Sequence, residues 1–345
     1  MKTGAVQVGE FALTLRTVLP SDSQAVTALH TLVFGPDVDG AWFTWKYGQA
    51  TGQGRSLGLW HDDNLIAYCG GLPRTLWQHG KSRSGLQIGD VMVHPAWRGI
   101  LTRRGPFFQV SQRFYQQQLG VAPERAFQLG FGFPNARHLR LAVLLGLLHD
   151  GGVMESLHWP VLAATNAGLP WHWRWKELLP TQPGFDRAVD AAWQAMRLRS
   201  PELLLGQRDA AYLRWRFADR PAAVGSNAAA TPRYRFYELR RPWSLRASGV
   251  AVLDLRADAA HWLDWVGPID LMPLASTACR LQAAHAGASE LTAWASAAVA
   301  QCLAHTGITQ REVCAALGLP TTSDLAPSEA AGLPWWLMGG DTDFL

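Results

Sequence analysis

Short stretches of alternating apolar and polar residues, and longer stretches with helical spacing, follow one another through the first 150 residues. Leu13 to Leu19 alternates as a strand does. Ser21 and Gln24 stand at the spacing of a capping box, directly before the apolar stretch Ala25 to Phe34. The chain is therefore predicted to open with a strand followed by a helix.

The same pattern predicts four further strands and two further helices before residue 150. Arg55 to Trp60 and Leu65 to Leu72 are apolar and flank His61 to Asn64, whose composition is typical of a hairpin turn. The remaining segments are the strand Gln87 to His94, the helix Pro106 to Leu119, the strand Arg125 to Phe133 and the helix Asn135 to Leu145, with Gly146 at its C-cap. The predicted order is β-α-β-β-β-α-β-α.

The second half of the chain repeats two short patterns of the first half. Trp42 to Tyr47 is similar to Tyr212 to Phe217, 170 positions later. Leu145 to Leu147 recurs as Leu317 to Leu319, 172 positions later. Two similar offsets indicate a duplicated domain, although matches this short also arise by chance.

Residues 161–205 are predicted to connect the two halves. This stretch holds Trp171 to Trp175, prolines at positions 180 and 183, and a helical pattern from Phe185 to Leu198. Domains are therefore predicted at residues 1–160 and 206–345. The length of 345 residues agrees with two domains of roughly 150 residues each. Because 48% of the residues are hydrophobic and only 17% are charged, disorder from excess charge is excluded.

The net charge is +4, from 31 basic and 27 acidic residues. This balance permits a phosphate-bearing ligand but lacks the dense basic stripe of a nucleic-acid-binding protein. The amino terminus has no signal-peptide pattern, and the longest apolar candidate, Leu139 to Leu148, is far shorter than the ~20 residues that a bilayer requires. We therefore expect a soluble, cytoplasmic protein with neither a nucleic-acid nor a membrane partner.

No metal or redox site is expected. The four cysteines form no C-x-x-C pair and the eleven histidines form no H-x-x-x-H pair, so buried thiols are the simpler interpretation. The chain also lacks G-x-S-x-G, G-x-G-x-x-G and G-x-x-x-x-G-K-[ST]. The chain therefore lacks the sequence signatures of serine hydrolases, dinucleotide enzymes and P-loop NTPases.

A basic loop separates the predicted strand that ends at His94 from the helix that begins at Pro106. Such a loop can direct backbone N–H groups, together with the first turn of the helix, toward a phosphate. Proline suits the first helical position because no N–H is needed there. Arg98, Arg103 and Arg104 can add charged hydrogen bonds. The alternative is an ordinary connection whose arginines are solvated.

Residues around this loop resemble the GNAT superfamily of acyl-CoA-dependent N-acyltransferases. Val91 to Gly99 is similar to the family's fourth strand and the start of its pyrophosphate loop, and Gly132 to Asn135 is similar to the next strand. The resemblance covers about residues 11–150. It implies an α/β (α+β) fold with two GNAT-like domains, each a mixed, mostly antiparallel central sheet flanked by helices. The second domain resembles a degenerate copy, most clearly at Trp335 to Asp341.

The resemblance also implies acetyl-CoA as the co-substrate. In this family the sheet opens between two strands and the pantetheine arm lies in the gap. The residues that the resemblance assigns to CoA are Met92, Val93, Arg98, Gly99, Ile100, Leu101, Thr102, Arg103, Arg104, Gly105 and Asn135. The loop is two residues longer than the family pattern and lacks its middle glycine. Position 142, where the family usually has a general-acid tyrosine, is Ala142.

Acyl transfer to an amine benefits from a group that removes the proton of the ammonium form. Asp90 lies on the predicted cofactor strand. It is either the base that removes this proton or a structural partner for an arginine. Asp341 and the terminal carboxylate of Leu345 are alternative candidates, if the C-terminal segment enters a cleft between the domains rather than fraying. The second half is expected not to bind CoA, because Val266 to Ser289 has no basic glycine loop before a helix predicted at Glu290 to Ala304.

Together these features predict an N-acetyltransferase that acetylates a primary amine of a small molecule or sugar. The alternative, from a different class, is a catalytically silent acyl-CoA-binding or protein-interaction module.

Overall fold

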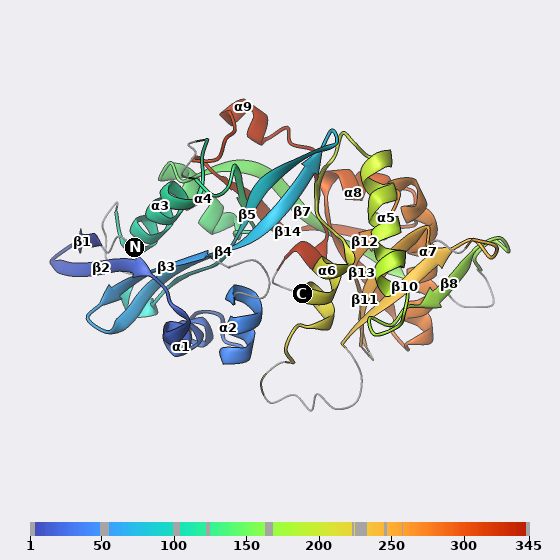
Figure 1. Ribbon diagram of the computed structural model, residues 1–345, viewed down its shortest axis with the longest axis horizontal. Helices are drawn as coiled ribbons and strands as arrows, with labels where there is room; N and C mark the ends of the chain where they lie inside the picture. Colours follow the sequence, from blue (N-terminus) through green and yellow to red (C-terminus); the bar gives the residue numbers. More distant parts are fainter. Residues whose placement is uncertain are drawn as a thin grey trace.

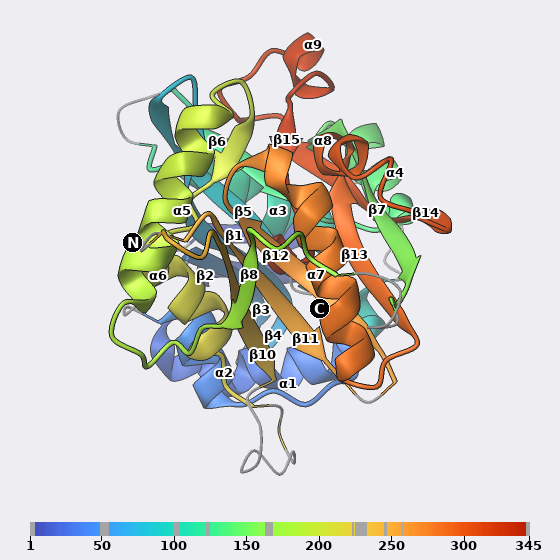
Figure 2. The same ribbon diagram turned by 90° about the vertical axis from the view of Figure 1, so that its right-hand side faces the viewer.

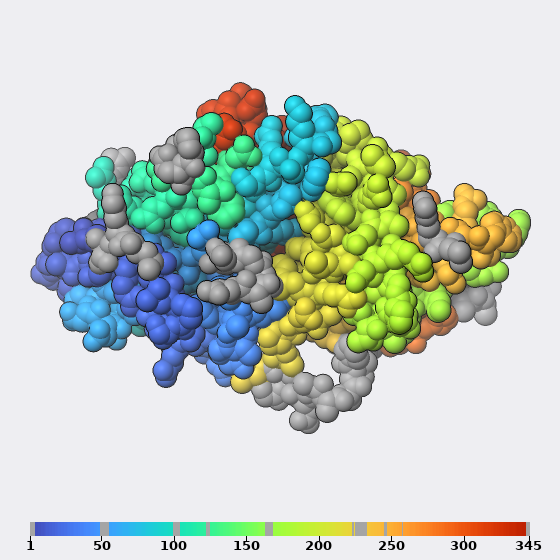
Figure 3. Space-filling view, in the orientation of Figure 1, coloured from blue at the N-terminus to red at the C-terminus, as the bar shows by residue number. Residues whose placement is uncertain are grey.

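The computed structural model describes residues 4–48, 55–98, 104–121, 125–162, 168–222, 224, 233–244, 247–256 and 258–342. Its strands form one continuous, mostly antiparallel sheet in the order β1-β2-β3-β4-β5-β6-β14-β7-β13-β12-β11-β10-β8, with helices on both faces (Figure 1). The predicted fold class is confirmed. In the space-filling view, the first half of the chain (blue to green) and the second half (yellow to orange) occupy opposite ends of one face (Figure 3).

The first half contains all eight elements that the sequence predicts. Its elements are β1 (Gly4–Val8), β2 (Phe11–Thr17), α1 (Ser23–Phe34), α2 (Gly40–Tyr47), β3 (Arg55–His61), β4 (Asn64–Gln78), β5 (Lys81–Val93), α3 (Pro106–Gln118), β6 (Leu129–Gly132), α4 (Ala136–Leu144) and β7 (Leu148–Pro160). β1, α2 and β7 were not predicted. β4 and β5 are longer than predicted and β6 is shorter.

The second half contains β8 (Arg174–Glu177), α5 (Phe185–Arg199), β9 (Leu204–Gly206), α6 (Ala210–Leu213), β10 (Tyr234–Arg240), β11 (Gly249–Leu255), β12 (Ala260–Val266), α7 (Met272–His285), β13 (Glu290–Ser296), α8 (Ala297–Cys302), β14 (Gln310–Pro320), α9 (Pro327–Ala330) and β15 (Trp335–Trp336). In Figure 2 the strands β8, β10, β11 and β12 lie between α5 and α7.

Two local predictions are wrong. Glu290 to Ser296 is a strand because its side chains are buried alternately, and the helix predicted there begins only at Ala297. The turn before α1 is capped by Asp22 rather than by Ser21 and Gln24, since the Asp22 carboxylate accepts the Leu19 N–H at 2.7 Å. Residues 161–205, predicted as a connector, also contribute a strand, β8, which pairs with β10 at the edge of the sheet.

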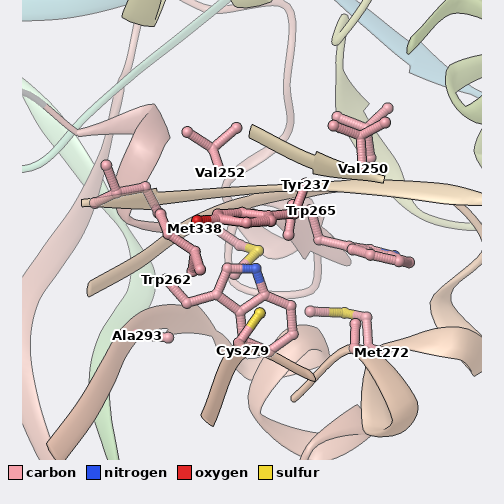
Figure 4. Packing of buried hydrophobic residues seen from close by; sticks show 14 of the residues in the cluster. Tyr237, Val250, Val252, Trp262, Trp265, Met272, Cys279, Ala293 and Met338 are labelled. Carbon is pink, nitrogen blue, oxygen red and sulfur yellow. The ribbon is translucent and has the colours of Figure 1, made fainter. Parts of the chain in front are cut away.

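The two faces of the first half have separate cores. α3 and α4 cover one face, where Leu86, Val110 and Phe114 belong to a common buried cluster. α1 and α2 cover the other face, where Val26 and Tyr68 are fully buried. A third and larger cluster fills the second half, and Figure 4 shows its close packing around Trp262, Trp265 and Cys279.

The order of elements in the second half repeats that of the first. The matching pairs are β2 and β8, α1 and α5, α2 and α6, β3 and β10, β4 and β11, β5 and β12, α3 and α7, β6 and β13, α4 and α8, and β7 and β14. The last pair changes places: β14 inserts beside β6, and β7 pairs with β13. Each half thus donates its final strand to the sheet of the other half.

The two sequence repeats have different outcomes. Trp45 and Trp215, from the first repeat, stack with ring centroids 5.6 Å apart. Each indole N–H donates to the carbonyl oxygen of the other residue, at 2.7 and 3.0 Å. This reciprocal contact joins Trp45 of α2 to Trp215, which lies in the π-helical turn Arg214–Ala218 directly after α6. The second repeat is not equivalent, because Leu145 to Leu147 precedes β7 whereas Leu317 to Leu319 lies inside β14.

Candidate active site

A gap opens between β5 and β6. The two strands pair in parallel from Gly85 and Leu129 to Ile88 and Gly132, and the pairing stops there. A pocket of about 220 Å³ occupies the space beyond. Its lining comes from both faces of the sheet: Phe107, Tyr115, His138 and Ala142 from α3 and α4, and Phe34 from α1. The pocket therefore reaches both faces, and this is the gap that the family resemblance implies for pantetheine.

A β-bulge marks the pocket wall at Asp90. The β4–β5 register shifts between Tyr68 and Gly70, and Asp90 has a φ of 51°. A left-handed backbone at a residue other than glycine costs energy and is concentrated at functional sites. The bulge also leaves one residue outside the ladder of the sheet. Asp90 and Val91 line the pocket and have no register partner on β4, whereas the preceding Gly89 still pairs with Gly70.

The Asp90 carboxylate is held by two side chains of α2. Its Oδ2 atom lies 2.7 Å from Lys46 Nζ and accepts the Tyr47 hydroxyl at 2.6 Å. The side chains of Lys46 and Asp90 are 2% and 7% exposed, so the ion pair is buried. The structural partner is therefore a lysine and not the arginine that the sequence suggested. Burial, with the nearby charge of Asp90, raises the pKa values of Tyr68 and Cys69 well above their ordinary values.

Several residues assigned to CoA by sequence lie at the outer side of this gap. Arg98 is exposed, and its Nε donates to the Val93 carbonyl oxygen at 3.0 Å. Asn135 is the N-cap of α4, where its Oδ1 accepts the His138 N–H at 2.9 Å. Arg104 and Gly105 directly precede α3, which begins with Pro106. Gly99, Ile100, Leu101, Thr102 and Arg103 lie outside the described residues.

The environment of Met92 does not fit a side chain that binds CoA, which is the role assigned to it from the sequence. Its side chain is fully buried in the core under α1, so a ligand in the gap can reach it only through its backbone. Val93 is partly buried against the core of the opposite face. This alternation follows from the period of two along a strand.

Sequence reasoning missed two residues that line the pocket, Tyr115 and His138. It also missed Lys46 and Tyr47, which bind Asp90 in the pocket wall. Burial, together with the charges of Arg137 and Arg98, lowers the pKa of His138 below its ordinary value. Burial raises the pKa of Tyr115 well above its ordinary value. At neutral pH the imidazole is therefore uncharged and the phenol keeps its proton. The pattern of buried positions in α3 contained Tyr115, but nothing local indicated that its ring would reach a pocket.

The C-terminal segment enters the middle of the molecule. Asp341 is 1% exposed. Its Oδ1 accepts Arg74 NH2 at 3.0 Å, its Oδ2 accepts both Arg208 NH2 and the Met338 N–H, and its carbonyl accepts Gln87 Nε2 at 2.5 Å. Burial alone would raise the pKa of Asp341, but Arg208 and Arg74 hold it below the ordinary value. The segment is therefore not a frayed tail up to Thr342, whereas Leu345 lies outside the described residues.

The matching gap of the second half is filled by this same segment. β12 and β13 pair only at Ala260 with Leu291 and at His261 with Thr292. Beyond that point the Ser296 N–H donates to the Leu337 carbonyl oxygen, and Ala295 forms a bridge with Met338. Figure 4 shows Met338 beside Trp262. The chain's own residues thus take the space that a ligand would need.

Among the described residues, no cluster of three or more histidine, cysteine, aspartate or glutamate side chains is arranged to hold a metal ion. Within the same residues, no helix has both the length and the apolar character required to span a bilayer.

Comparison with known proteins identifies what this architecture is similar to. Residues 14–139 match the family model of the acetyltransferase (GNAT) domain. No curated protein matches the chain by sequence. The resemblance stated from the sequence is confirmed for the matched residues.

Solved structures match most of the chain in fold. GCN5-related N-acetyltransferases from Kribbella flavida and Anabaena variabilis each have 14% sequence identity, with TM-scores of 0.60 and 0.61. The alignments cover 89% of this chain and 70% and 72% of those chains. The N-myristoyltransferase of Saccharomyces cerevisiae, solved with bound myristoyl-CoA, has 11% identity and a TM-score of 0.54, over 89% of this chain and 79% of its own.

Proposed function

We infer that the protein, whose residues 14–139 are a GNAT domain, is an N-acyltransferase that uses an acyl-CoA. The pocket at the β5–β6 gap, with a strained bulge in its wall, is the observation that carries this inference. It reaches both faces of the sheet, so one substrate can approach from α3 and the other from α1. As a thioester, the bound acyl-CoA presents a carbonyl carbon that an amine can attack.

The residues at the gap fit such a ligand. The phosphates would meet Arg98, Arg104 and the N-terminus of α3, where free N–H groups and the helix dipole favour negative charge. The apolar walls, including Phe107 and Tyr115, suit an alkyl arm. At the bulge, backbone N–H groups outside the regular ladder can stabilise the negative charge that develops on a reacting carbonyl oxygen.

Asp90 is our candidate for the group that takes the proton of the acceptor amine. An alkylammonium of pKa ~10.4 is protonated at pH 7, and removing that proton costs roughly 4–5 kcal/mol. Among the described residues, the Asp90 carboxylate contacts Lys46 and Tyr47 through Oδ2, so we assign this task to Oδ1. We prefer Asp90 to Asp341 because both carboxylate oxygens of Asp341 already bind arginines.

We further propose that the two halves are tandem GNAT-like domains, at residues 1–160 and 206–345, joined by residues 161–205. The repeated order of elements supports this division. Only the first half is proposed to bind CoA, since the matching gap of the second half holds the C-terminal segment. The proposed acceptor is a primary amine on a small molecule or sugar in the cytoplasm, and acetyl is the simplest acyl group.

Two observations favour a second candidate function. The Lys46–Asp90 pair already neutralises the proposed base, and Ala142 cannot donate a proton to a departing thiolate. A silent acyl-CoA-binding or protein-interaction module would have these features.

Titration calorimetry with CoA, followed by a screen of amines for release of free thiol from acetyl-CoA, separates these functions. Binding with turnover supports the enzyme, and binding without turnover on any amine supports the silent module. Absence of CoA binding would overturn both proposals.

A further inference from the structure

The inner end of the pocket is bounded by very small residues. β14 pairs with β6 through Gly318 and Gly132, and both glycines line the pocket. Ala142 of α4 lies beside them and is 1% exposed. Because these residues carry at most a methyl group, the pocket extends inward to the backbone where the two halves of the chain meet.

The two glycines leave no room for a side chain beside this end of the pocket. A Cβ added to Gly132 would lie 3.2 Å from Ile88 Cβ, and a Cβ added to Gly318 would lie 2.8 Å from Leu148 Cδ1. Ile88 and Leu148 are themselves lining residues. A side chain at either glycine position would therefore require the neighbouring lining residue to shift. We call the space bounded by these five residues, Ile88, Gly132, Ala142, Leu148 and Gly318, the inner recess.

The inner recess is apolar, whereas the outer part of the pocket is polar. Asn135 and His138 lie at the first turn of α4, and Ala142 lies about one turn further along. On β5, Asp90 is two residues beyond Ile88. Ile88, Ala142 and Leu148 belong to one buried hydrophobic cluster. Gln87, next to Ile88 on β5, also lines the pocket, but its side-chain amide is bound to Arg74 and to the Asp341 carbonyl oxygen. A ligand that passes the polar groups would therefore meet mainly hydrocarbon at the inner end.

We propose that the inner recess receives the alkyl chain of an acyl-CoA longer than acetyl, in the range of butanoyl to octanoyl. This inference rests on the proposed function and names the substrate class for the same site. An acetyl group has no methylene to bury there. Each methylene that leaves water strengthens binding by about fourfold. The N-acyl product would accordingly carry a medium-length saturated chain.

The test compares CoA, acetyl-CoA, hexanoyl-CoA and octanoyl-CoA by calorimetry on the full chain, with thiol release measured on any amine that is accepted. Hexanoyl-CoA is expected to bind at least about tenfold more tightly than acetyl-CoA. Equal or weaker binding of hexanoyl-CoA, in a protein that binds CoA, overturns this inference and leaves the proposed function standing. Absence of CoA binding overturns the proposed function instead.

Two variants locate the effect. Ala142→Leu fills the inner recess and should abolish the preference for hexanoyl-CoA while CoA affinity stays within about twofold. Gly318→Ala narrows the inner recess less and should reduce the preference at least threefold, so it carries the test if Ala142→Leu fails to fold. Val143→Leu is the matched control, since Val143 is 44% exposed on the same helix and should leave the preference unchanged. An unchanged preference in a folded Gly318→Ala or Ala142→Leu protein overturns the assignment.

Discussion

The β5–β6 gap and the β12–β13 gap occupy matching places in the two halves but differ in what fills them. The first contains a pocket of about 220 Å³ whose inner end is two glycines and an alanine. The second contains Trp336, Met338 and the turn Gly339–Asp341. Both halves thus retain the same separation of strands. The difference teaches that the same separation of strands can hold a pocket in one half and a structural core in the other, where the chain supplies the occupant.

The bulges beside the two gaps show the same divergence. The β4–β5 ladder shifts at Asp90, and the β11–β12 ladder shifts between Val252 and Leu253. In the first half, Lys46 of α2 binds the carboxylate at the bulge. Its counterpart by the Trp45–Trp215 match is Arg216, whose Nε donates to the Gly340 carbonyl oxygen at 2.7 Å. Lys46 therefore binds the carboxylate beside the β5–β6 gap, whereas Arg216 binds the segment that fills the β12–β13 gap.

The largest expected effect comes from replacing Asp90, at the bulge beside the β5–β6 gap. Asp90→Asn should lower turnover by about 10²–10⁴-fold, the range for loss of a positioned proton acceptor, while CoA affinity changes little. Asparagine also tolerates the left-handed backbone at this position. A pH–rate profile on an accepted amine, with folding checked by circular dichroism, measures the effect.

Asp62→Asn provides the control for this substitution. Asp62 has the same φ of 51°, but its side chain is 87% exposed in the β3–β4 turn. It should leave turnover unchanged. Full activity of the Asp90→Asn protein would remove Asp90 from the mechanism.

The filled gap should respond in stability rather than in catalysis. Trp336→Ala removes a fully buried side chain and should lower the free energy of unfolding by about 3–5 kcal/mol. Chemical denaturation measures this loss. CoA binding by the folded variant should remain at one site per chain, and calorimetry that reports two sites would show that the second gap is still a ligand site.

The phosphate end of the open gap should show a smaller effect. Arg98→Ala combined with Arg104→Ala is expected to weaken CoA binding by about 1.5–3 kcal/mol for each charged hydrogen bond lost. Arg199→Ala is the control, because Arg199 is exposed in the other half and pairs with Asp270. Equal CoA affinity in the double variant and the control would reject this assignment.

The smallest expected effect is a pH dependence of protein stability that arises from Asp264, beside the filled gap. Burial, opposed by Arg208, raises the pKa of Asp264 to about 6, which is above its value in the unfolded chain. The folded protein therefore binds more protons than the unfolded chain between about pH 4 and 6, and Asp264 makes stability fall as pH rises through that range. Asp264→Asn should remove this fall, so its stability relative to the original protein should increase from pH 4.5 to pH 7. A difference that is independent of pH would contradict the assignment.

The sequence predicted what depends on near neighbours along the chain. The periodicity of Pro106 to Leu119 reflects one helix face, and the Arg55 to Leu72 hairpin depends on a local turn, so both were predicted correctly. The contact of Lys46 with Asp90 joins residues on different elements. Asp341 reaches Arg74 across 267 positions. No local pattern contains such pairs, and the side chains around the pocket were therefore largely missed.

A sequence motif can also be interpreted correctly without revealing which distant residues will contact it. The family resemblance led to the β5–β6 gap through the motif around Val91 to Gly99. It could not show that Gly318, from the far end of the chain, would form the floor. That outcome depends on the exchange of β7 and β14, which is a property of tertiary pairing rather than of either strand alone.

The exchanged strands have a consequence for synthesis of the protein. Gly132 acquires its partner on β14 only after residue 318 has left the ribosome, so the first half cannot complete its sheet as it emerges. At roughly 5–20 residues per second, the edge of β6 waits on the order of ten seconds or more. During that interval its unpaired backbone groups can pair with another nascent chain. A chaperone bound during this interval would protect the β5–β6 gap until β14 has been translated.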